Sequence, residues 1–109
     1  MPPPARNLGI TGCYHDGMQR FSSPFGVVTL TEERKAHILA FHPDVRRYLK
    51  YFALVLAEPE LVVPSVHDRA VLICYGLVPK TKKYLAIVVK TGSKPFILTA
   101  YVAKKPKKP

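Results

Sequence analysis

Three apolar segments in the second half of the chain are joined by very short connections, and this spacing constrains the fold more than any other feature. The segments are rich in β-branched and aromatic residues and cover residues 69–78, 83–90 and 95–103. Their connections, PKTK and TGSK, are too short for a crossover between parallel strands, so we expect neighbouring strands to run antiparallel. The run YLAIVV is apolar on both faces, which predicts a central position in the sheet for residues 83–90.

A further strand, over residues 61–66, precedes these segments and contains Pro64. Proline removes one donor from the hydrogen-bonded ladder, which favours a position at the edge of the sheet. In the last strand, alternation predicts one face that packs on the helices, formed by Phe96, Leu98, Ala100 and Val102. The opposite face is then formed by Ile97, Thr99 and Tyr101.

Residues 31–45 have the pattern of a capped helix. The Thr31 hydroxyl can cap it, and Glu32 and Glu33 lie where the helix dipole favours negative charge. Pro43 stops or kinks this helix. A second helical segment is expected to about residue 57, because an apolar stripe at helical spacing is formed by Val45, Leu49, Phe52 and Leu56. These elements predict an α+β fold in which two N-terminal helices pack on a four-stranded antiparallel sheet.

The chain of 109 residues, 48% of them apolar, is long enough for one domain with a modest core. Residues 1–23 hold three prolines and three glycines and are expected to form an irregular arm, and residues 104–109, KKPKKP, a basic tail. The domain then covers residues 24–103, with a short strand over residues 24–30 leading into the first helix. No run approaches the roughly 18 to 20 apolar residues of a membrane span, and MPPPARNLG lacks the apolar middle of a signal peptide, so we expect a cytoplasmic protein.

The cysteines indicate neither a disulfide framework nor a metal centre. Cys13 and Cys74 are too few for such a framework, and Cys74, within an apolar run, is expected to be a buried thiol. Cys13 and His15 form a C-x-H pair that lacks the further ligands of a zinc site. We therefore expect no metal and no other cofactor.

The net charge of +10 is carried by the second half of the chain. Residues 1–68 hold all seven acids and seven of the seventeen bases, whereas residues 69–109 hold ten bases and no acid. If the second half forms a sheet, its exposed positions create a positive surface that attracts a polyanion through long-range attraction and counterion release. Alternatively, these bases form a solvated face, and a merely solubilising tail is formed by Lys104, Lys105, Lys107 and Lys108.

The order of the elements and five short motifs resemble a known architecture. The motifs are Thr31-x-x-Arg34-x-x-His37-Ile38, His42-Pro43-Asp44, Glu58-Pro59-Glu60, Lys83-Tyr84-Leu85 leading to Val88-Val89, and Phe96-Ile97-Leu98-Thr99-Ala100-Tyr101. Together they resemble the small metal-independent ribonucleases and toxins that include barnase, EndoU, colicin nuclease domains and RelE, above all their phage-associated and bacterial branch. The resemblance covers residues 27–103 and implies a RelE/barnase-like domain.

The resemblance implies a toxin-type endoribonuclease that cleaves RNA by attack of the ribose 2'-hydroxyl on its own phosphate, with an antitoxin or immunity protein as its cognate partner. Such cleavage needs a base, cationic groups on the phosphate and a proton donor. His37 is the candidate base or acid, because an imidazole titrates near neutral pH. The other catalytic candidates are Arg69, for transition-state charge, and Thr99 and Tyr101, for phosphate orientation or proton donation. The candidates for RNA or phosphate binding are Arg34, His42, Lys82, Lys83 and Lys90.

The same residues also have non-catalytic interpretations. His37 can be a structural hydrogen-bonding residue, His42 can hold the end of the helix, and Tyr101 can cover the edge of the sheet. No glutamate follows residue 60 to serve as the base that barnase-like members use on their sheet. The alternatives to an enzyme are therefore a non-catalytic RNA-binding module and a protein-interaction domain with a basic face.

Overall fold

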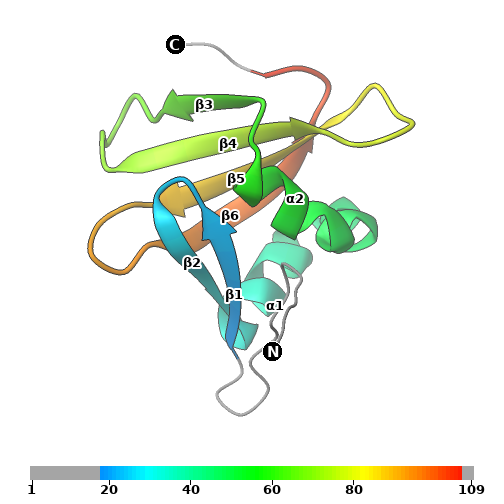
Figure 1. The fold of residues 1–109 in the computed structure, drawn as a ribbon. Helices are drawn as coiled ribbons and strands as arrows, with labels where there is room; N and C mark the ends of the chain where they lie inside the picture. The colour runs from blue at the N-terminus through cyan, green and yellow to red at the C-terminus, as the bar shows by residue number, and fades with distance from the viewer. Residues whose placement is uncertain (1–17, 107–109) are drawn as a thin grey trace, which may run out of the picture.

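Six strands and three helical segments make up residues 18–106, the part of the chain that the computed structural model describes. In chain order they are β1 (Met18–Ser23), β2 (Gly26–Thr31), α1 (Glu32–Phe41), the 3-10 helix η1 (Pro43–Tyr51), α2 (Phe52–Ala57), β3 (Leu61–Pro64), β4 (Val71–Leu77), β5 (Tyr84–Lys90) and β6 (Phe96–Ala103). The strands form one sheet in the order β1-β2-β6-β5-β4-β3 (Figure 1). The sheet is mixed, because β2 and β6 pair in parallel and the other neighbours antiparallel, and it curls into a half-barrel.

The expected arrangement of two N-terminal helices on a four-stranded antiparallel sheet is wrong. A hairpin of β1 and β2 precedes the helical segments and joins the sheet through a parallel pairing between Thr29 and Phe96. β1 lies within the stretch expected to be an irregular arm, and β2 corresponds to the short strand expected over residues 24–30. Residues 1–17 of the arm and residues 107–109 of the expected tail lie outside the described residues.

The turn between β1 and β2 explains why a hairpin forms here. Residues 23–26 read Ser-Pro-Phe-Gly, and serine first, proline second and glycine fourth are typical of a type I turn. Ser23 Oγ accepts the N–H of Phe25 at 3.0 Å and donates to the carbonyl oxygen of Gly26 at 2.8 Å. Gly26 has a φ of 109°, which other residues rarely adopt. Of the β1 residues only Phe21 is buried, so the alternation is too weak to predict this strand by itself.

The strands predicted in the second half of the chain are confirmed. β3, β4, β5 and β6 pair with their sequence neighbours in antiparallel register, and β3, which contains Pro64, lies at one edge of the sheet. β5 lies between β4 and β6 as expected, and its Leu85, Ala86 and Ile87 are fully buried. The short connections therefore determine the arrangement of β4, β5 and β6, and Pro64 indicates the edge position of β3.

A β-bulge in β6 changes the faces expected for this strand. The register of β6 against β5 shifts between Val88 and Val89, which leaves Leu98 as an extra residue. Ile97, expected on the face opposite the helices, is therefore turned into the main core and is only 1% exposed. Phe96, expected against the helices, is 38% exposed. The alternation predicted for the start of β6 is wrong because a strict alternation does not account for an inserted residue.

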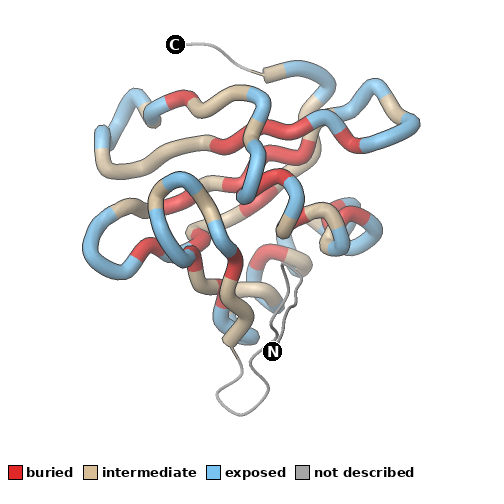
Figure 2. Tube along the Cα trace, in the orientation of Figure 1, coloured by how far each residue is buried: buried red, intermediate tan, exposed pale blue. Residues whose placement is uncertain are grey.

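The two expected helical segments are observed, although the second begins as the 3-10 helix η1 and continues as α2. Thr31 caps α1 as predicted, because its Oγ1 accepts the N–H of Arg34 at 3.1 Å. The main core lies between the helical segments and one face of the sheet (Figure 2), and its helical members include Val45, Phe52 and Leu56. Within residues 18–106 no helix is both long and apolar enough to cross a membrane.

A smaller apolar cluster lies on the other face of the sheet, over β3, β4 and β5. Its buried members are Val63, Tyr75 and Ala86, with half-buried Tyr84 and Tyr101 packed beside them. Apolar side chains on both faces explain why β4 and β5 read as continuous apolar runs. Polar and charged groups therefore lie mainly at the strand ends and in the connections, and a candidate site is expected there.

Candidate nucleic-acid interface

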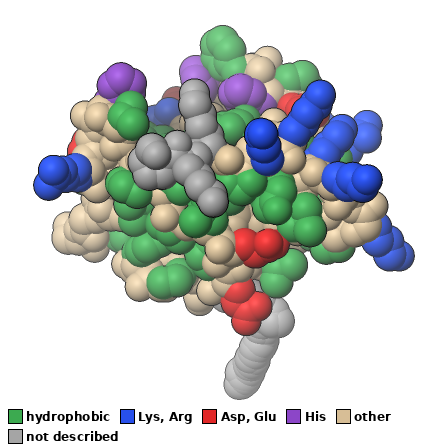
Figure 3. All heavy atoms as spheres, turned by 90° about the horizontal axis from the view of Figure 1, so that it is seen from above, with side chains coloured by type: hydrophobic (Ala, Val, Ile, Leu, Met, Phe, Trp, Pro, Cys, Tyr) green, Lys and Arg blue, Asp and Glu red, His purple; other side chains and the backbone are tan. Residues whose placement is uncertain are grey.

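Five exposed lysines gather at one end of the sheet, which we call the basic end: Lys80, Lys82, Lys83, Lys104 and Lys105. The first three lie in the connection between β4 and β5, and the other two follow β6. The pairing of Tyr84 with Leu77 on one side and Ala103 on the other brings both segments to the same end. Figure 3 shows Lys and Arg side chains gathered on the side of the molecule where the β4–β5 connection lies.

The register of β5 and β6 brings like charges together at the basic end. Lys83 directly precedes Tyr84 and Lys104 directly follows Ala103, so the two lysines lie just beyond the last paired position of β5 and β6. Residues directly opposite each other in such a register stand about 5 Å apart, and like charges there destabilise a sheet. A negatively charged partner removes this repulsion. The arrangement therefore favours anion binding over a role in stability.

The β4–β5 connection carries its lysines on a hydrogen-bonded loop. The N–H of Val78 donates to the carbonyl oxygen of Lys83 at 2.9 Å and closes the loop. The Thr81 hydroxyl donates to the carbonyl oxygen of Val78 at 2.8 Å and accepts the N–H of Lys83 at 3.1 Å. Val78 itself is buried and anchors the loop to the main core. The lysine backbones are thus positioned before any partner binds.

Lys80 has a φ of 64°, in the left-handed region that favours glycine. Lys80→Gly is expected to raise the free energy of unfolding by up to about 1 kcal/mol, because relief of the left-handed strain (about 1–2 kcal/mol) exceeds the added chain entropy of glycine (about 0.5–1 kcal/mol). Urea unfolding measures the change. Lys82→Gly removes the same charge where φ is not positive, and should lower the free energy of unfolding by about 0.5–1 kcal/mol. Equal losses in both variants would contradict this account.

Glu60 lies at the same end of the sheet, but its groups are engaged by β4. Its carboxylate Oε2 accepts the N–H of Leu77 at 2.7 Å, and its own N–H donates to the carbonyl oxygen of Tyr75 at 2.8 Å. This acid therefore serves to hold the start of β3 against β4. One carboxylate leaves the charge of the basic end, with its five lysines, strongly positive.

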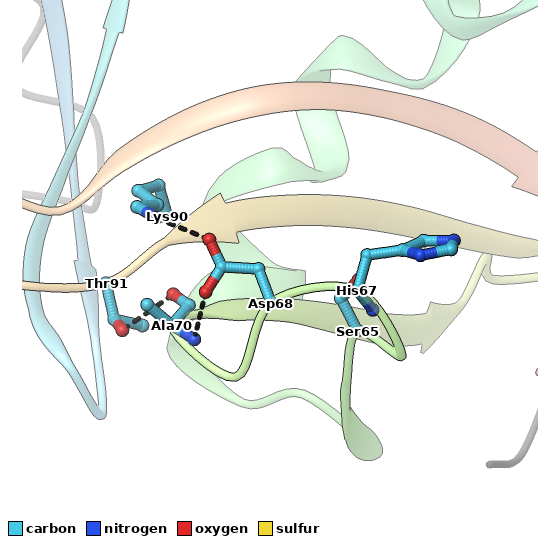
Figure 4. A network of polar contacts seen from close by, with 6 residues as sticks. All are labelled: Ser65, His67, Asp68, Ala70, Lys90 and Thr91. Atoms are coloured by element: carbon cyan, nitrogen blue, oxygen red, sulfur yellow. Dashed lines mark hydrogen bonds and ion pairs between the residues drawn. The ribbon is translucent and has the colours of Figure 1, made fainter.

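The other bases predicted for a positive sheet surface lie at the opposite end. Arg69 lies in the β3–β4 connection, Lys90 ends β5, and Lys94 lies in the β5–β6 connection. The seven residues of β5 separate the two ends by about 20 Å. Lys90 Nζ lies 2.6 Å from Asp68 Oδ2 in an ion pair (Figure 4). The bases thus form two separate groups, and Lys90 already has a carboxylate partner.

The Asp68–Lys90 pair leads to a prediction about stability in acid. The hydrogen bond from Lys90, and next that from the Ala70 N–H, lower the pKa of Asp68 below its ordinary value of 3.8. The folded state therefore holds this proton less tightly than the unfolded chain, and the stabilisation is present above pH 3.8 and is lost as the pH falls through the folded-state pKa. Asp68→Asn should make the urea midpoint less dependent on pH in this acid range. An unchanged acid dependence would contradict a stabilising pair.

Four residues with predicted roles lie along the stretch where α1 runs beside β6. Arg34 donates from Nη1 to the carbonyl oxygen of Leu98 at 3.4 Å. His42, at the C-terminal cap of α1, has its ring centroid 6.2 Å from that of Tyr101. Thr99 lies on β6 between these two contacts. The structure therefore shows two separate contacts along β6, one with Arg34 and one with the His42 ring.

The remaining catalytic candidates lie elsewhere. His37 is on an exposed part of α1 with its ring centroid 4.7 Å from that of Phe41, which is 69% exposed. Arg69 and Lys90 are at the end of the sheet opposite the basic end, and Lys82 and Lys83 are in the basic end. The candidates expected from the sequence therefore do not converge on one site.

Tyr101 is held in its neutral form. Burial, and next the hydrogen bond with Tyr75, raise the pKa of Tyr101 above its ordinary value of 10.0. The two hydroxyl oxygens are 3.4 Å apart. Such a phenol can donate a hydrogen bond to a phosphate at neutral pH but cannot take a proton from a ribose hydroxyl. Tyr101 is therefore excluded as the base for RNA cleavage.

The C-x-H pair of Cys13 and His15 lies outside the described residues. Cys74 is a buried free thiol, as predicted, and burial raises the pKa of Cys74 to about 11. Among residues 18–106 no group of three or more His, Cys, Asp or Glu side chains is arranged to hold a metal ion.

Comparisons with protein-family models, with curated proteins and with solved structures give no significant match. The basic end is therefore defined by the geometry of this chain alone. Lys80, Lys104 and Lys105 belong to it although they are not among the site candidates drawn from the sequence. The predicted antiparallel pairing of β5 with β6 is the signal that identifies them, because it brings residues 82–83 and 104–105 to the same end.

Proposed function

We propose that this protein is a cytoplasmic RNA-binding module that holds the phosphate backbone of RNA at its basic end. One observation carries the proposal: two chain segments present five exposed lysines at the same end of the sheet, where Lys83 and Lys104 flank the last paired position of β5 and β6. Lysines that neutralise phosphates release condensed counterions, which drives association. A polymer of regularly spaced phosphates matches such a row of cationic groups.

The chemistry of the basic end predicts tolerance of sequence. Lysine acts as a point charge, and contacts to phosphates position a nucleic acid without identifying its bases. We therefore expect similar affinities for RNAs of different sequence but equal length, and a strong dependence on salt. The proposed role is to bind RNA rather than to select one sequence.

The experiment is an anisotropy titration of a labelled, mixed-sequence single-stranded RNA with the full chain in excess chelator. The same samples are then analysed on a denaturing gel. Binding that weakens with salt while the RNA stays intact supports the proposal. Absence of binding at low salt, under conditions where the protein is folded by circular dichroism, contradicts it.

Ribonuclease activity is the second candidate, and the contact of His42 with Tyr101 beside β6 favours it. In this candidate His42 takes the proton of the ribose hydroxyl while Tyr101 and Arg34 donate hydrogen bonds to the phosphate. Cleavage that leaves cyclic phosphate ends, and that is lost in His42→Ala and in Tyr101→Phe, would support it. Cleavage that survives in both variants would assign the activity to a contaminant. An antitoxin or immunity protein is proposed as a partner only together with this activity.

A further inference from the structure

A pocket of about 310 Å³ lies where β2 and β6 pair in parallel, far from the basic end. It is lined by Thr29, Thr31, Arg34, Lys94, Phe96 and Ile97. The RNA-binding proposal uses none of these residues, and the ribonuclease candidate uses only Arg34 among them. Because two of its lining groups are cationic and none is acidic, the lining favours an anion as the occupant.

The fold brings these residues together from three separate elements. The N–H of Thr29 donates to the carbonyl oxygen of Pro95 at 3.1 Å, which places the start of β6 beside β2. Lys94 immediately precedes Pro95 in the β5–β6 connection. Arg34 lies in the first turn of α1, three residues after the capping residue Thr31. The pocket thus depends on the non-local β2–β6 pairing and on the start of α1.

The two cations remain suited to a ligand. Arg34 carries five N–H donors, of which Nη1 makes a long bond of 3.4 Å to the carbonyl oxygen of Leu98. Lys94 is exposed at the rim. The nearest acids in sequence are Glu32 and Glu33, and Glu32 lines a different pocket between α1 and η1. A guanidinium binds phosphate oxygens through paired charge-assisted hydrogen bonds, and an ammonium binds them as a point charge.

An aromatic ring gives the pocket a second chemical character. Phe96 is 38% exposed and lies beside the cations, with buried Ile97 behind it. A ring surface of this kind stacks on a planar base or packs on a sugar. The volume lies at the lower end of the range for small-molecule sites, which limits the occupant to about one nucleotide. We propose that this pocket binds a nucleoside monophosphate, with its phosphate on Arg34 and Lys94 and its base or sugar against Phe96.

The test is isothermal titration of the full chain with AMP, GMP, CMP and UMP, with the corresponding nucleosides, and with inorganic phosphate. At least one nucleotide is expected to bind with a stoichiometry of one, and its nucleoside and inorganic phosphate each about tenfold or more weakly. Saturation by inorganic phosphate at the same affinity as the nucleotides would show an adventitious anion site only. Absence of binding by all four nucleotides would also overturn the proposal.

Variants separate the pocket from general electrostatic attraction. Lys94→Gln is expected to weaken nucleotide binding about tenfold or more, and Phe96→Leu to weaken the nucleotide but not inorganic phosphate. Lys104→Gln is the matched control, because it removes the same charge at the other end of the sheet. Equal losses in Lys94→Gln and Lys104→Gln would overturn the proposal. The outcome is independent of RNA binding, which Lys104→Gln and not Lys94→Gln should weaken.

Discussion

Gly76→Ala is expected to lower the free energy of unfolding by about 1–3 kcal/mol, a large effect for the addition of one methyl group. Gly76 is buried in β4 and faces α2. A Cβ atom there would lie 2.6 Å from Cγ2 and 3.1 Å from Cγ1 of Val55. Val55 cannot turn aside easily, because it is 2% exposed and a β-branched side chain on a helix has essentially one rotamer.

A double-mutant cycle with Val55→Ala tests this mechanism. Val55→Ala alone should destabilise the protein by leaving a cavity, but in the Gly76→Ala background it also removes the clash. The coupling free energy between the two sites, from urea unfolding, should be at least about 1 kcal/mol and favourable in the double variant. Additivity within about 0.5 kcal/mol would contradict the packing of α2 on β4.

The triple replacement of Lys82, Lys83 and Lys104 by glutamine is expected to weaken binding of single-stranded RNA about a hundredfold at about 0.1 M salt. Each phosphate contact contributes about 0.7 to the salt exponent, so three lost contacts change the affinity by about two orders of magnitude under these conditions. The stability of the variant should not fall, because the replacement removes repulsion between neighbouring lysines.

The matched control replaces Lys35, Arg69 and Lys94 by glutamine. It removes the same formal charge from residues that lie outside the basic end. Its affinity for RNA should stay within a few-fold of the wild type, since charges outside the binding site act on RNA only through long-range attraction. A loss as large as that of the first variant would mean that net charge, and not the basic end, determines binding.

Local rules predict the part of the fold in which neighbouring strands are also neighbours in sequence. The connections PKTK and TGSK leave β4, β5 and β6 no alternative to antiparallel pairing, and Pro64 assigns β3 to an edge. The parallel pairing of Thr29 with Phe96 has no local signal, because these residues are far apart in sequence. The bulge at Leu98 is equally invisible to a pattern of alternation, although it decides that Ile97 is buried.

The candidate site, like the fold, can be predicted from the sequence only in part. The distribution of charge predicts an anion-binding surface, but only the register of β5 and β6 shows that Lys83 and Lys104 share one end while Arg69 and Lys90 lie at the other. A sequence gives the chemical type of His42 but not the contact of its ring with Tyr101. Residue type limits the chemistry that is available, and long-range pairing decides which groups meet.

The most direct test of RNA binding at the basic end is the salt dependence of the RNA association constant for the wild type and for the variant lacking Lys82, Lys83 and Lys104. If all five lysines contact phosphates, the wild type should give a slope of log K against log salt of about −3.5. The variant should give a slope shallower by about 2, and the control lacking Lys35, Arg69 and Lys94 should keep the wild-type slope. An unchanged slope in the first variant, or an equal change in the control, would contradict the basic end as the RNA-binding site.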